Sequence, residues 1–587
     1  MNKPIDVKSE KIAAAGELLG GALTTFDATP MPKVPLKIDY GTRLVLVNPD
    51  RSREHSIAKF VPSPYHGTWR LKHYLERRHN WPTAVIDFNI HDRYAVMKDL
   101  EKYRPPFIGF AYFYDTLQQD LENLWAIRCI SPDSFYIAGG IEATARAAEY
   151  IAKLPLEGLL RGEGEFALSA LMAAAEPLDQ KIDKDALIEK SKDIPGWLFK
   201  RTDGAIQIGK PAKTITEEQY SDVFETYNID PVDYEPYWNF IDDQYEDDLL
   251  EVLDVNPKMV RLITSNYCPY GCAFCVSTNF LKMASEEKKV KVVGASADQL
   301  FEKVQAILDR DSEIFIYFDD ENFMAMPARA RELCEKIIDS GLVGKFGCRA
   351  TAQMITDDIC SLMSRAGFKV VAFGAESWDD DTLKDFNKRL ENDRSDIAIH
   401  NIMKNNMRCS FNVILFAPKM SRGGLIKTCD KIVKYIGLDC NVGITTYIAP
   451  YPGTAYFGND AYHVVDGTLT VPGTGATLAF PQAILPSDDT LRAVAEASQQ
   501  RGREIISEWK EYFDWRYEIV PREVSCLALI AGVYRELGIY DEAERRITIL
   551  GIVERILRNR RTHFVRTTPN AALLRAAEAG VVNDSQY

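Results

Sequence analysis

Three cysteines stand close together in the stretch "CPYGCAFC", at Cys268, Cys272 and Cys275. A structural zinc site takes four ligands and a disulfide takes two, so a group of three needs another explanation. Three thiolates on one short loop can hold three irons of a four-iron, four-sulfur cluster and leave the fourth iron open to a substrate or cofactor. The alternatives are zinc with a distant fourth ligand and three unrelated core cysteines. The spacing favours the cluster.

The cysteines directly follow the first of six short β-type runs between residues 256 and 478. These runs are "MVRLITSN", "EIFIYFDD", "KFGCRA", "KVVAFGAES", "CSFNVILFAP" and "NVGITTYIAP", and helical segments separate them. Strands alternating with helices in this way predict a full or partial β/α barrel, whose chemistry lies at the carboxyl ends of its strands. The cysteine loop is expected at that end.

An earlier alternation covers residues 41–178, with the β-type runs "RLVLVN", "TAVIDF", "FIGFAYF", "FYIAGG" and "LEGLLRG". It predicts a doubly wound, Rossmann-like α/β domain with ligands beyond the carboxyl ends of its strands. Glycines fall at these ends, and as a set they favour a binding cleft, although any single glycine is explained by the turn it makes. The sequence has no GxGxxG or GxxxxGK[ST] motif, so it lacks the usual nucleotide phosphate cradles.

The remaining segments carry no chemical motif. Residues 1–40 are expected to be an N-terminal extension, and residues 179–255 a hairpin turning at Asp203–Gly204 followed by an acidic, aromatic connector. The connector is expected to link domains or to be a solvated face, with a contribution to an active site as the alternative. Residues 479–587 predict a helical domain.

Composition narrows the class of protein. The net charge of −15 argues against a nucleic-acid-binding surface. The longest apolar run, "CLALIAGVY", is too short to span a membrane. The N-terminus lacks the layout of a signal peptide. The cysteines outside the group of three are scattered along the chain, which favours a reducing compartment over a disulfide framework. We expect a cytoplasmic protein without a membrane span. The cysteines outside the group of three are expected to be buried as small apolar side chains. They are Cys129, Cys334, Cys348, Cys360, Cys409, Cys429, Cys440 and Cys526. As an alternative, either Cys348 or Cys409 faces a cavity.

The Cys-x3-Cys-x2-Cys spacing, with an aromatic residue before the last cysteine, resembles the signature of radical S-adenosylmethionine (SAM) enzymes. The resemblance implies a [4Fe–4S] cluster whose open iron binds the amino and carboxylate groups of SAM. "YFDDENF", "FGAES" and "YIAPYPGTAYF" are similar to further stretches of this family, whereas "VILFAPKMSRGG" lacks the usual glycine-rich ending of the fifth strand. The residues that the resemblance assigns to SAM are Phe274, Asp319, Asp320, Glu321, Glu376 and Ser377.

The stretch "FYIAGGIEATARAAEYIAKLPLEGLLRGEGEFAL" is similar to the cobalamin-binding domain of the cobalamin-dependent branch of this family. The residues on matching positions are Gly139, Gly140, Gly162, Glu163, Gly164 and Glu165, and Gly109, Phe110 and Ala111, in the preceding β-type run, are also expected to contact cobalamin. The D-x-H-x-x-G pattern that supplies a histidine to cobalt is absent, and His55 and His66 are expected to be loop histidines. The resemblance therefore implies base-off cobalamin without a protein histidine ligand.

Together these features suggest a methyltransferase that uses a 5′-deoxyadenosyl radical and methylcobalamin to methylate an unactivated carbon or a phosphinate phosphorus. Two alternatives stay open: a cyclase or rearrangement enzyme with the same cofactors, and a cobalamin or iron–sulfur sensor without turnover. The expected substrate is a natural-product-type small molecule or peptide. An electron donor such as flavodoxin or ferredoxin is implied, and no nucleic-acid partner is expected.

Overall fold

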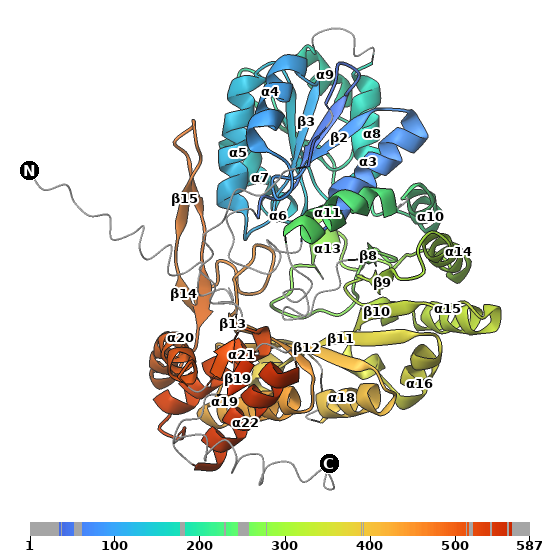
Figure 1. Ribbon diagram of the computed structural model, residues 1–587. Coiled ribbons are helices and arrows are strands. Elements are labelled where there is room, and N and C mark those ends of the chain that lie inside the picture. Colours follow the sequence, from blue (N-terminus) through green and yellow to red (C-terminus); the bar gives the residue numbers. More distant parts are fainter. Residues whose placement is uncertain are drawn as a thin grey trace, which may run out of the picture.

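The computed structural model describes residues 34–36, 38–51, 62–176, 182–227, 231–244, 258–277, 279–388, 390, 393–511, 513–515, 520–540, 543–559 and 563–565. Two α/β domains face each other, and a helical region covers one side of the second (Figure 1). Within the described ranges, no helix combines the length and apolar character needed to cross a membrane. His55 and most of the N-terminal extension lie outside these ranges.

The first domain is the doubly wound fold that the sequence predicts. Its parallel strands lie in the order β2-β1-β3-β4-β5. They are β1 (Leu44–Val47), β2 (Thr83–Ile86), β3 (Phe107–Ala111), β4 (Phe135–Gly139) and β5 (Gly158–Leu160). One apolar core packs the sheet against α4 (Arg93–Tyr103), α5 (Leu117–Ile130), α6 (Ile141–Ala145) and α7 (Ala147–Lys153). A second packs the other face against α3 (His66–His79) and α8 (Glu165–Ala174).

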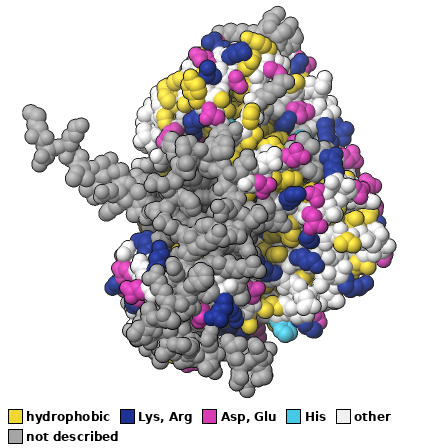
Figure 2. All heavy atoms as spheres, in the orientation of Figure 1, with side chains coloured by type: hydrophobic (Ala, Val, Ile, Leu, Met, Phe, Trp, Pro, Cys, Tyr) yellow, Lys and Arg dark blue, Asp and Glu magenta, His cyan; other side chains and the backbone are white. Residues whose placement is uncertain are grey.

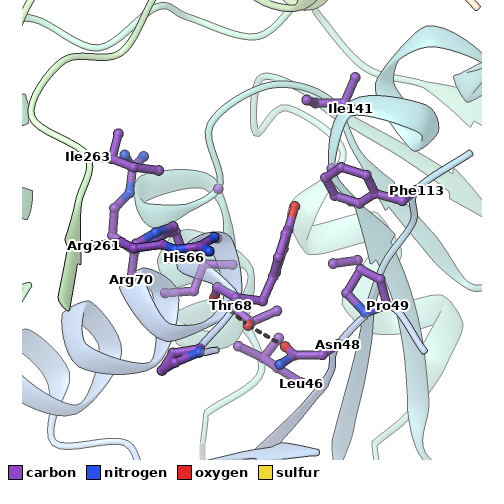
Figure 3. Close-up of a pocket in the computed structure, with 18 of the residues that line it drawn as sticks. Leu46, Asn48, Pro49, His66, Thr68, Arg70, Phe113, Ile141, Arg261 and Ile263 are labelled. Carbon is purple, nitrogen blue, oxygen red and sulfur yellow. Dashed lines mark hydrogen bonds between the residues drawn. The ribbon is translucent and has the colours of Figure 1, made fainter. Parts of the chain in front are cut away.

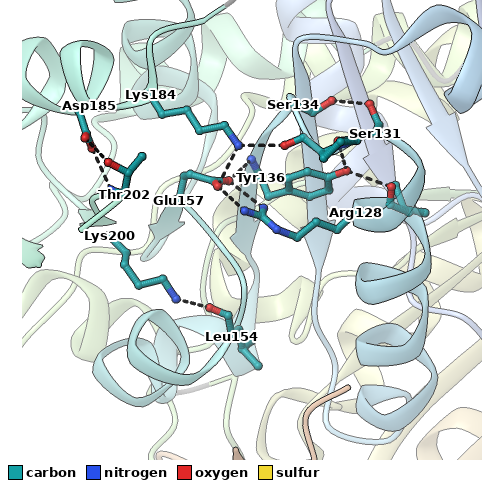
Figure 4. Close-up of polar contacts among 12 residues, drawn as sticks. Arg128, Ser131, Ser134, Tyr136, Leu154, Glu157, Lys184, Asp185, Lys200 and Thr202 are labelled. Carbon is teal, nitrogen blue, oxygen red and sulfur yellow. Dashed lines mark hydrogen bonds and ion pairs between the residues drawn. The ribbon is translucent and has the colours of Figure 1, made fainter. Parts of the chain in front are cut away.

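The hairpin expected in the connector belongs to this sheet instead. Strands β6 (Trp197–Lys200) and β7 (Ile206–Ile208) add antiparallel strands beyond β5, and α9 (Lys184–Ser191) precedes them. Buried Glu157 links these parts, because it accepts hydrogen bonds from Arg128 (2.6 Å), Lys184 (2.9 Å) and the Tyr136 amide (2.8 Å) (Figure 4). Although burial opposes it, these contacts lower the pKa of Glu157. The domain thus extends past residue 178, because β6 and β7 pair with its sheet although the alternation of strands and helices in the sequence ends before them.

The described part of the connector is more than a solvated face. Its helices are α10 (Glu217–Thr226) and α11 (Pro231–Gln244), which lie between the two domains (Figure 1). The aromatic side chains of Tyr234, Tyr237 and Trp238 are buried there. Glu235 and Asp242 on α11 are exposed, so this helix has a solvated acidic face as well as a buried aromatic one.

The second domain is a partial barrel of six parallel strands. They are β8 (Met259–Leu262), β9 (Phe315–Phe318), β10 (Lys345–Ala350), β11 (Phe368–Glu376), β12 (Arg408–Phe416) and β13 (Asn441–Tyr447), in sequential order. The helices are α13 (Phe280–Ser285), α14 (Ala297–Leu308), α15 (Pro327–Ser340), α16 (Asp357–Arg365), α17 (Asp380–Asp385), α18 (Arg394–Lys404) and α19 (Arg422–Gly437), with short 3-10 turns η1 (Phe323–Ala325) and η2 (Ala352–Met354). The sheet begins at β8 and ends at β13, so the barrel is open between these two edges.

A β-arm across the expected boundary at residue 478 connects the domains. Its strands are β14 (His463–Val465), β15 (Thr468–Thr470), β16 (Thr477–Ala479) and β17 (Ala483–Leu485). Leu469 and Leu478 join the core of the first domain, and Tyr114 stacks on Phe480 with ring centroids 4.4 Å apart. In Figure 1 the arm runs from the barrel up beside the first domain.

The helical region follows the arm rather than starting at residue 479. It contains α20 (Asp489–Trp509), α21 (Arg522–Glu536) and α22 (Ala543–Asn559), and α21 packs on β13 at the barrel edge. Strands β18 (Phe513–Trp515) and β19 (His563–Val565) pair beside these helices.

On the face drawn in Figure 2, acidic and basic side chains are intermixed.

The isolated cysteines are buried as expected, with one exception. Cys129 is exposed near the end of α5, on the side of the helix away from its buried residues Leu124 and Ile127. Cys348 and Cys409 both lie in the apolar core of the barrel domain.

Candidate active site between the two α/β domains

A cavity of about 860 Å³ lies between the carboxyl ends of the two sheets. Leu46, Asn48 and Pro49 line it from the end of β1, whereas Arg261 and Ile263 approach from the barrel (Figure 3). The residues that the resemblance assigned to cobalamin all line this cavity: Gly109, Phe110, Ala111, Gly139, Gly140, Gly162, Glu163, Gly164 and Glu165.

On the first-domain side of the cavity, glycines leave the main chain uncovered by side chains. A Cβ at Gly109 would lie 3.0 Å from Leu46 Cδ2. Gly140 and Gly162 have φ angles of +96° and +81°, which side-chain-bearing residues rarely adopt. A side chain at these positions would strain the backbone or fill the wall of the cavity, so this surface suits a large ligand that approaches the main chain closely.

Two buried glutamates on this wall share one arginine. Arg70 of α3 pairs with Glu165 through its Nε and lies 3.9 Å from Glu163 through Nη2. Burial raises the pKa of Glu163 to about 7, with Arg70 opposing the shift and Glu165 adding to it. The Glu163 carboxyl can therefore hold a proton near neutral pH, when it can donate a hydrogen bond as well as accept one.

The cysteine loop lies directly after β8, at the end of the barrel that faces the first domain. Phe274 packs on Phe386 with ring centroids 5.0 Å apart, and the Asn387 side chain donates to the carbonyl of Gly271 at 2.6 Å. The amide of Ala273 donates to the carbonyl of Phe386 at 2.9 Å. The segment after α17 thus fixes the loop that carries the three thiols.

The three thiols of the loop differ in burial. Cys268 is buried, Cys272 and Cys275 are partly buried, and burial raises the pKa of Cys268 to about 11. Within the described residues, no three metal-ligating side chains converge on one ion position. A zinc ion needs its ligand atoms about 2.0–2.3 Å from one point, whereas each thiolate on a four-iron cluster binds a different iron. Three thiols on one short loop are the donor set for three irons of a four-iron cluster, so the residues present fit such a cluster.

The three acidic residues after β9 have different surroundings. Asp320 is fully buried and accepts hydrogen bonds from the amides of Thr264 (2.8 Å) and Ser265 (2.6 Å), so it holds the turn after β8. Asp319 and Glu321 line the cavity. Glu321 is exposed and accepts a hydrogen bond from the Ser277 hydroxyl at 3.1 Å, beside the cysteine loop.

The end of β11 carries a buried ion pair. Glu376 has a φ of +62° and contacts Lys388 Nζ at 2.8 Å, with each side chain only 10% exposed. Burial alone would lower the pKa of Lys388, but Glu376 and then Cys272 raise it, which places this ammonium near the thiols. Ser377 is buried and accepts a hydrogen bond from the Asp379 amide at 3.0 Å. Neither Glu376 nor Ser377 lines the interdomain cavity.

Several residues of this site were missed from the sequence. His66 begins α3 and lines the cavity instead of lying on a loop, because the chain turns into the helix at Tyr65. Arg261 and Arg349 also line it, and their charged side chains within β-type runs were a signal for the barrel interior. For Lys388 the sequence offered no signal.

Comparison with known proteins agrees with this geometry. Residues 262–432 match the family model described as the Radical SAM superfamily. An uncharacterized methyltransferase of Pyrococcus horikoshii is 21% identical over 362 residues, which are 61% of this chain and 70% of that protein. The cytidylyl-2-hydroxyethylphosphonate methyltransferase of Streptomyces wedmorensis is 20% identical over 307 residues, which are 50% of this chain and about half (54%) of that protein.

The fold is also similar to a solved structure. The cobalamin-dependent SAM radical enzyme OxsB, with aqua-cobalamin and SAM bound, has a TM-score of 0.59 at 15% identity, covering 93% of this chain and 82% of that one. This likeness extends over both α/β domains and the helical region. The matched residues 262–432 include the cysteine loop and most barrel strands, and the chain as a whole has a fold similar to that of this cobalamin-dependent SAM radical enzyme.

Proposed function

We propose that this chain is a cobalamin-dependent radical SAM methyltransferase acting on an unactivated carbon or a phosphinate phosphorus of a natural-product-type small molecule or peptide. The supporting observation is the single cavity, which joins the glycine-rich loops of the first domain to the cysteine-loop end of the barrel. Bound there, the cluster and SAM would supply the 5′-deoxyadenosyl radical, and cobalamin would supply the methyl group. The methyltransferase names of the two relatives support the same reaction.

In this proposal the chain's residues hold and orient the cofactors and exclude water. Cys268, Cys272 and Cys275 would hold the cluster, which an external donor such as flavodoxin or ferredoxin would reduce. Glu321 would receive the ammonium group of SAM, because it is the carboxylate of the "DDE" stretch that is exposed beside the cysteine loop. Asp320 would only support that turn. The first-domain glycines would hold cobalamin.

Changing Cys268, Cys272 and Cys275 together to alanine should remove the cluster while cobalamin still binds, because the cobalamin wall lies on the other domain. The measurements are iron content and visible absorbance after anaerobic purification. Cys129→Ala is the matched control, since that thiol is exposed on α5, outside the site. Full iron content in the triple variant would contradict the assignment of these ligands.

Asp320→Asn and Glu321→Gln should distinguish the residue that supports the turn after β8 from the residue that binds SAM. Asp320→Asn weakens hydrogen bonds to a buried carboxylate, so we expect the free energy of unfolding to fall by about 2 kcal/mol. Glu321→Gln should leave stability unchanged and weaken SAM binding by about tenfold, through loss of one charged contact. Thermal unfolding and equilibrium dialysis with SAM provide the two readouts. Unchanged SAM affinity in Glu321→Gln would exclude this residue as the ammonium partner.

We also propose that cobalamin binds base-off without a histidine ligand. His66 lines the cavity, but its Nδ1 lies 2.5 Å from the Tyr227 hydroxyl and its Nε2 lies 3.7 Å from Asp319. Both ring nitrogens therefore face protein groups of the connector and the barrel. This arrangement supports a positioning role for His66 in the interdomain contact rather than cobalt ligation.

His66→Ala should leave the absorption spectrum of bound cobalamin unchanged, and excess imidazole should shift the spectra of variant and wild type equally. His79→Ala, at the exposed end of the same helix, is the matched control. A nitrogen-ligated spectrum in the wild type that is lost only in His66→Ala would identify His66 as the lower ligand and overturn the base-off proposal.

The proposed reaction is tested by anaerobic incubation of the cobalamin-loaded protein with a reductant and SAM deuterated on its methyl group. We expect 5′-deoxyadenosine, S-adenosylhomocysteine and deuterium-labelled methylcobalamin in the mass spectrum. 5′-Deoxyadenosine alone would favour the cyclase or rearrangement alternative. Bound cobalamin without any SAM cleavage would favour a sensor.

A further inference from the structure

We propose that Arg261 and Arg349 form a subsite for an oxyanion, a carboxylate or phosphate group, carried by the substrate. The inference rests on the proposed function, because it assigns the substrate class of that same cavity. Neither arginine belongs to the cysteine loop or to the glycine-rich loops, and both side chains enter the cavity from barrel strands.

The strand register brings the two arginines to the same part of the barrel. On β8, Val260 and Leu262 are buried in the core, so the alternate residue Arg261 faces inward. Arg261 pairs with Tyr317 on β9, and Tyr317 pairs with Gly347 on β10, two residues before Arg349. Both guanidinium groups therefore project from the interior face, from the two strands on either side of β9.

The two arginines share one close carboxylate. Arg349 Nη2 lies 2.8 Å from Asp319 Oδ1, and Arg261 Nη1 lies 3.8 Å from Asp319 Oδ2. Among the described residues, Asp319 is the only carboxylate within 4.0 Å of either guanidinium. Although burial opposes it, the pKa of Asp319 is lowered by His66, Arg349 and Arg261, so this carboxylate is charged between the two arginines. Glu321, which lines the same cavity, is the next carboxylate that acts on Arg349.

Hydrogen-bond donors remain available for a ligand. The side chains of Arg261 and Arg349 are 39% and 45% exposed, although both line an interdomain cavity. The buried Nε2 of His66 lies 3.7 Å from Asp319 Oδ2 and has no hydrogen-bond partner in the described parts of the chain. Guanidinium groups bind carboxylate and phosphate through paired N–H donors, which matches this surplus.

Helix α11 forms the neighbouring wall of the cavity, which is apolar, and it holds the backbone of Arg261. Tyr234 of α11 accepts a hydrogen bond from the Arg261 amide at 3.1 Å, so the connector holds this part of β8 in place. Trp238 and Ile241, on the same helix, line the cavity. A substrate with an apolar or aromatic body next to its oxyanion would meet both surfaces, and it would shield the ion contacts from water.

Two aromatic anions of similar size test the subsite: benzoate and phenyl phosphate, with benzamide as the neutral counterpart. Isothermal titration calorimetry on the cluster- and cobalamin-loaded protein should show saturable binding of at least one anion and not of benzamide. Binding of benzoate alone, or of phenyl phosphate alone, would identify the oxyanion as carboxylate or phosphate.

Substitutions then locate the site. Arg261→Gln and Arg349→Gln should each weaken anion binding by about tenfold or more, since each removes a charged hydrogen-bond donor. Arg349→Lys should give an intermediate loss, because lysine keeps the charge without the paired donors. Arg365→Gln, at the exposed end of α16, is the matched control and should bind as the wild type does.

Three results would overturn the subsite: no saturable binding of either anion, equal binding of benzamide, or unchanged affinity in both glutamine variants. A loss of bound cobalamin in these variants would also overturn it, because the arginines would then serve the cofactor. Melting temperature and iron content show whether each variant is folded. Failure of the proposed methyl transfer is detected separately with deuterated SAM, and it leaves the anion measurement on the same protein interpretable.

Discussion

The two parallel sheets direct their carboxyl ends toward each other across one cavity, and the rest of the site depends on this opposition. Residues of α11 join the domains: the Tyr237 hydroxyl donates to Asp87 of the first domain at 3.1 Å, and Tyr234 bonds to the backbone of β8. The β-arm fixes the opposite side, where the Arg146 guanidinium donates to the Ala479 carbonyl at 2.8 Å. Because the loops at the carboxyl ends of both sheets form the walls of the cavity, a relative shift of the domains would move the two walls apart.

Closing such a cavity buries charged groups, which is favourable only where partners replace the lost water. Each buried charge near the site has one. Arg70 pairs with Glu165, and Lys388 pairs with Glu376 beside the cysteine loop. The positive φ of Glu376 shows that the backbone at the end of β11 is held in an unusual conformation while this pair is formed. Among the described residues, Arg261 and Arg349 have Asp319 as their one close carboxylate, and a substrate anion bound there would add a second.

The sequence predicted the elements well where local pattern and burial agree. The alternation of strands and helices predicted both α/β domains, and the cysteine spacing placed the thiols at the reactive end of the barrel. Boundaries were less predictable. The hairpin at β6 and β7 joins the first domain, and the arm crosses the expected start of the helical region, because pairing partners far apart in the chain decide both. Aromatic residues of the acidic connector are buried for the same reason.

The sequence by itself determined which residue types can do chemistry: three closely spaced thiols, acidic residues after the second barrel strand, and glycines at the strand ends of the first domain. Only the tertiary structure decided their separate situations, with Asp320 buried in hydrogen bonds and Glu321 exposed beside the cysteine loop. Only the tertiary structure also brought His66, Arg261 and Arg349 to one cavity. The reason is physical: spacing along a strand or loop constrains neighbours in sequence, whereas burial and charge pairing depend on segments that meet after folding.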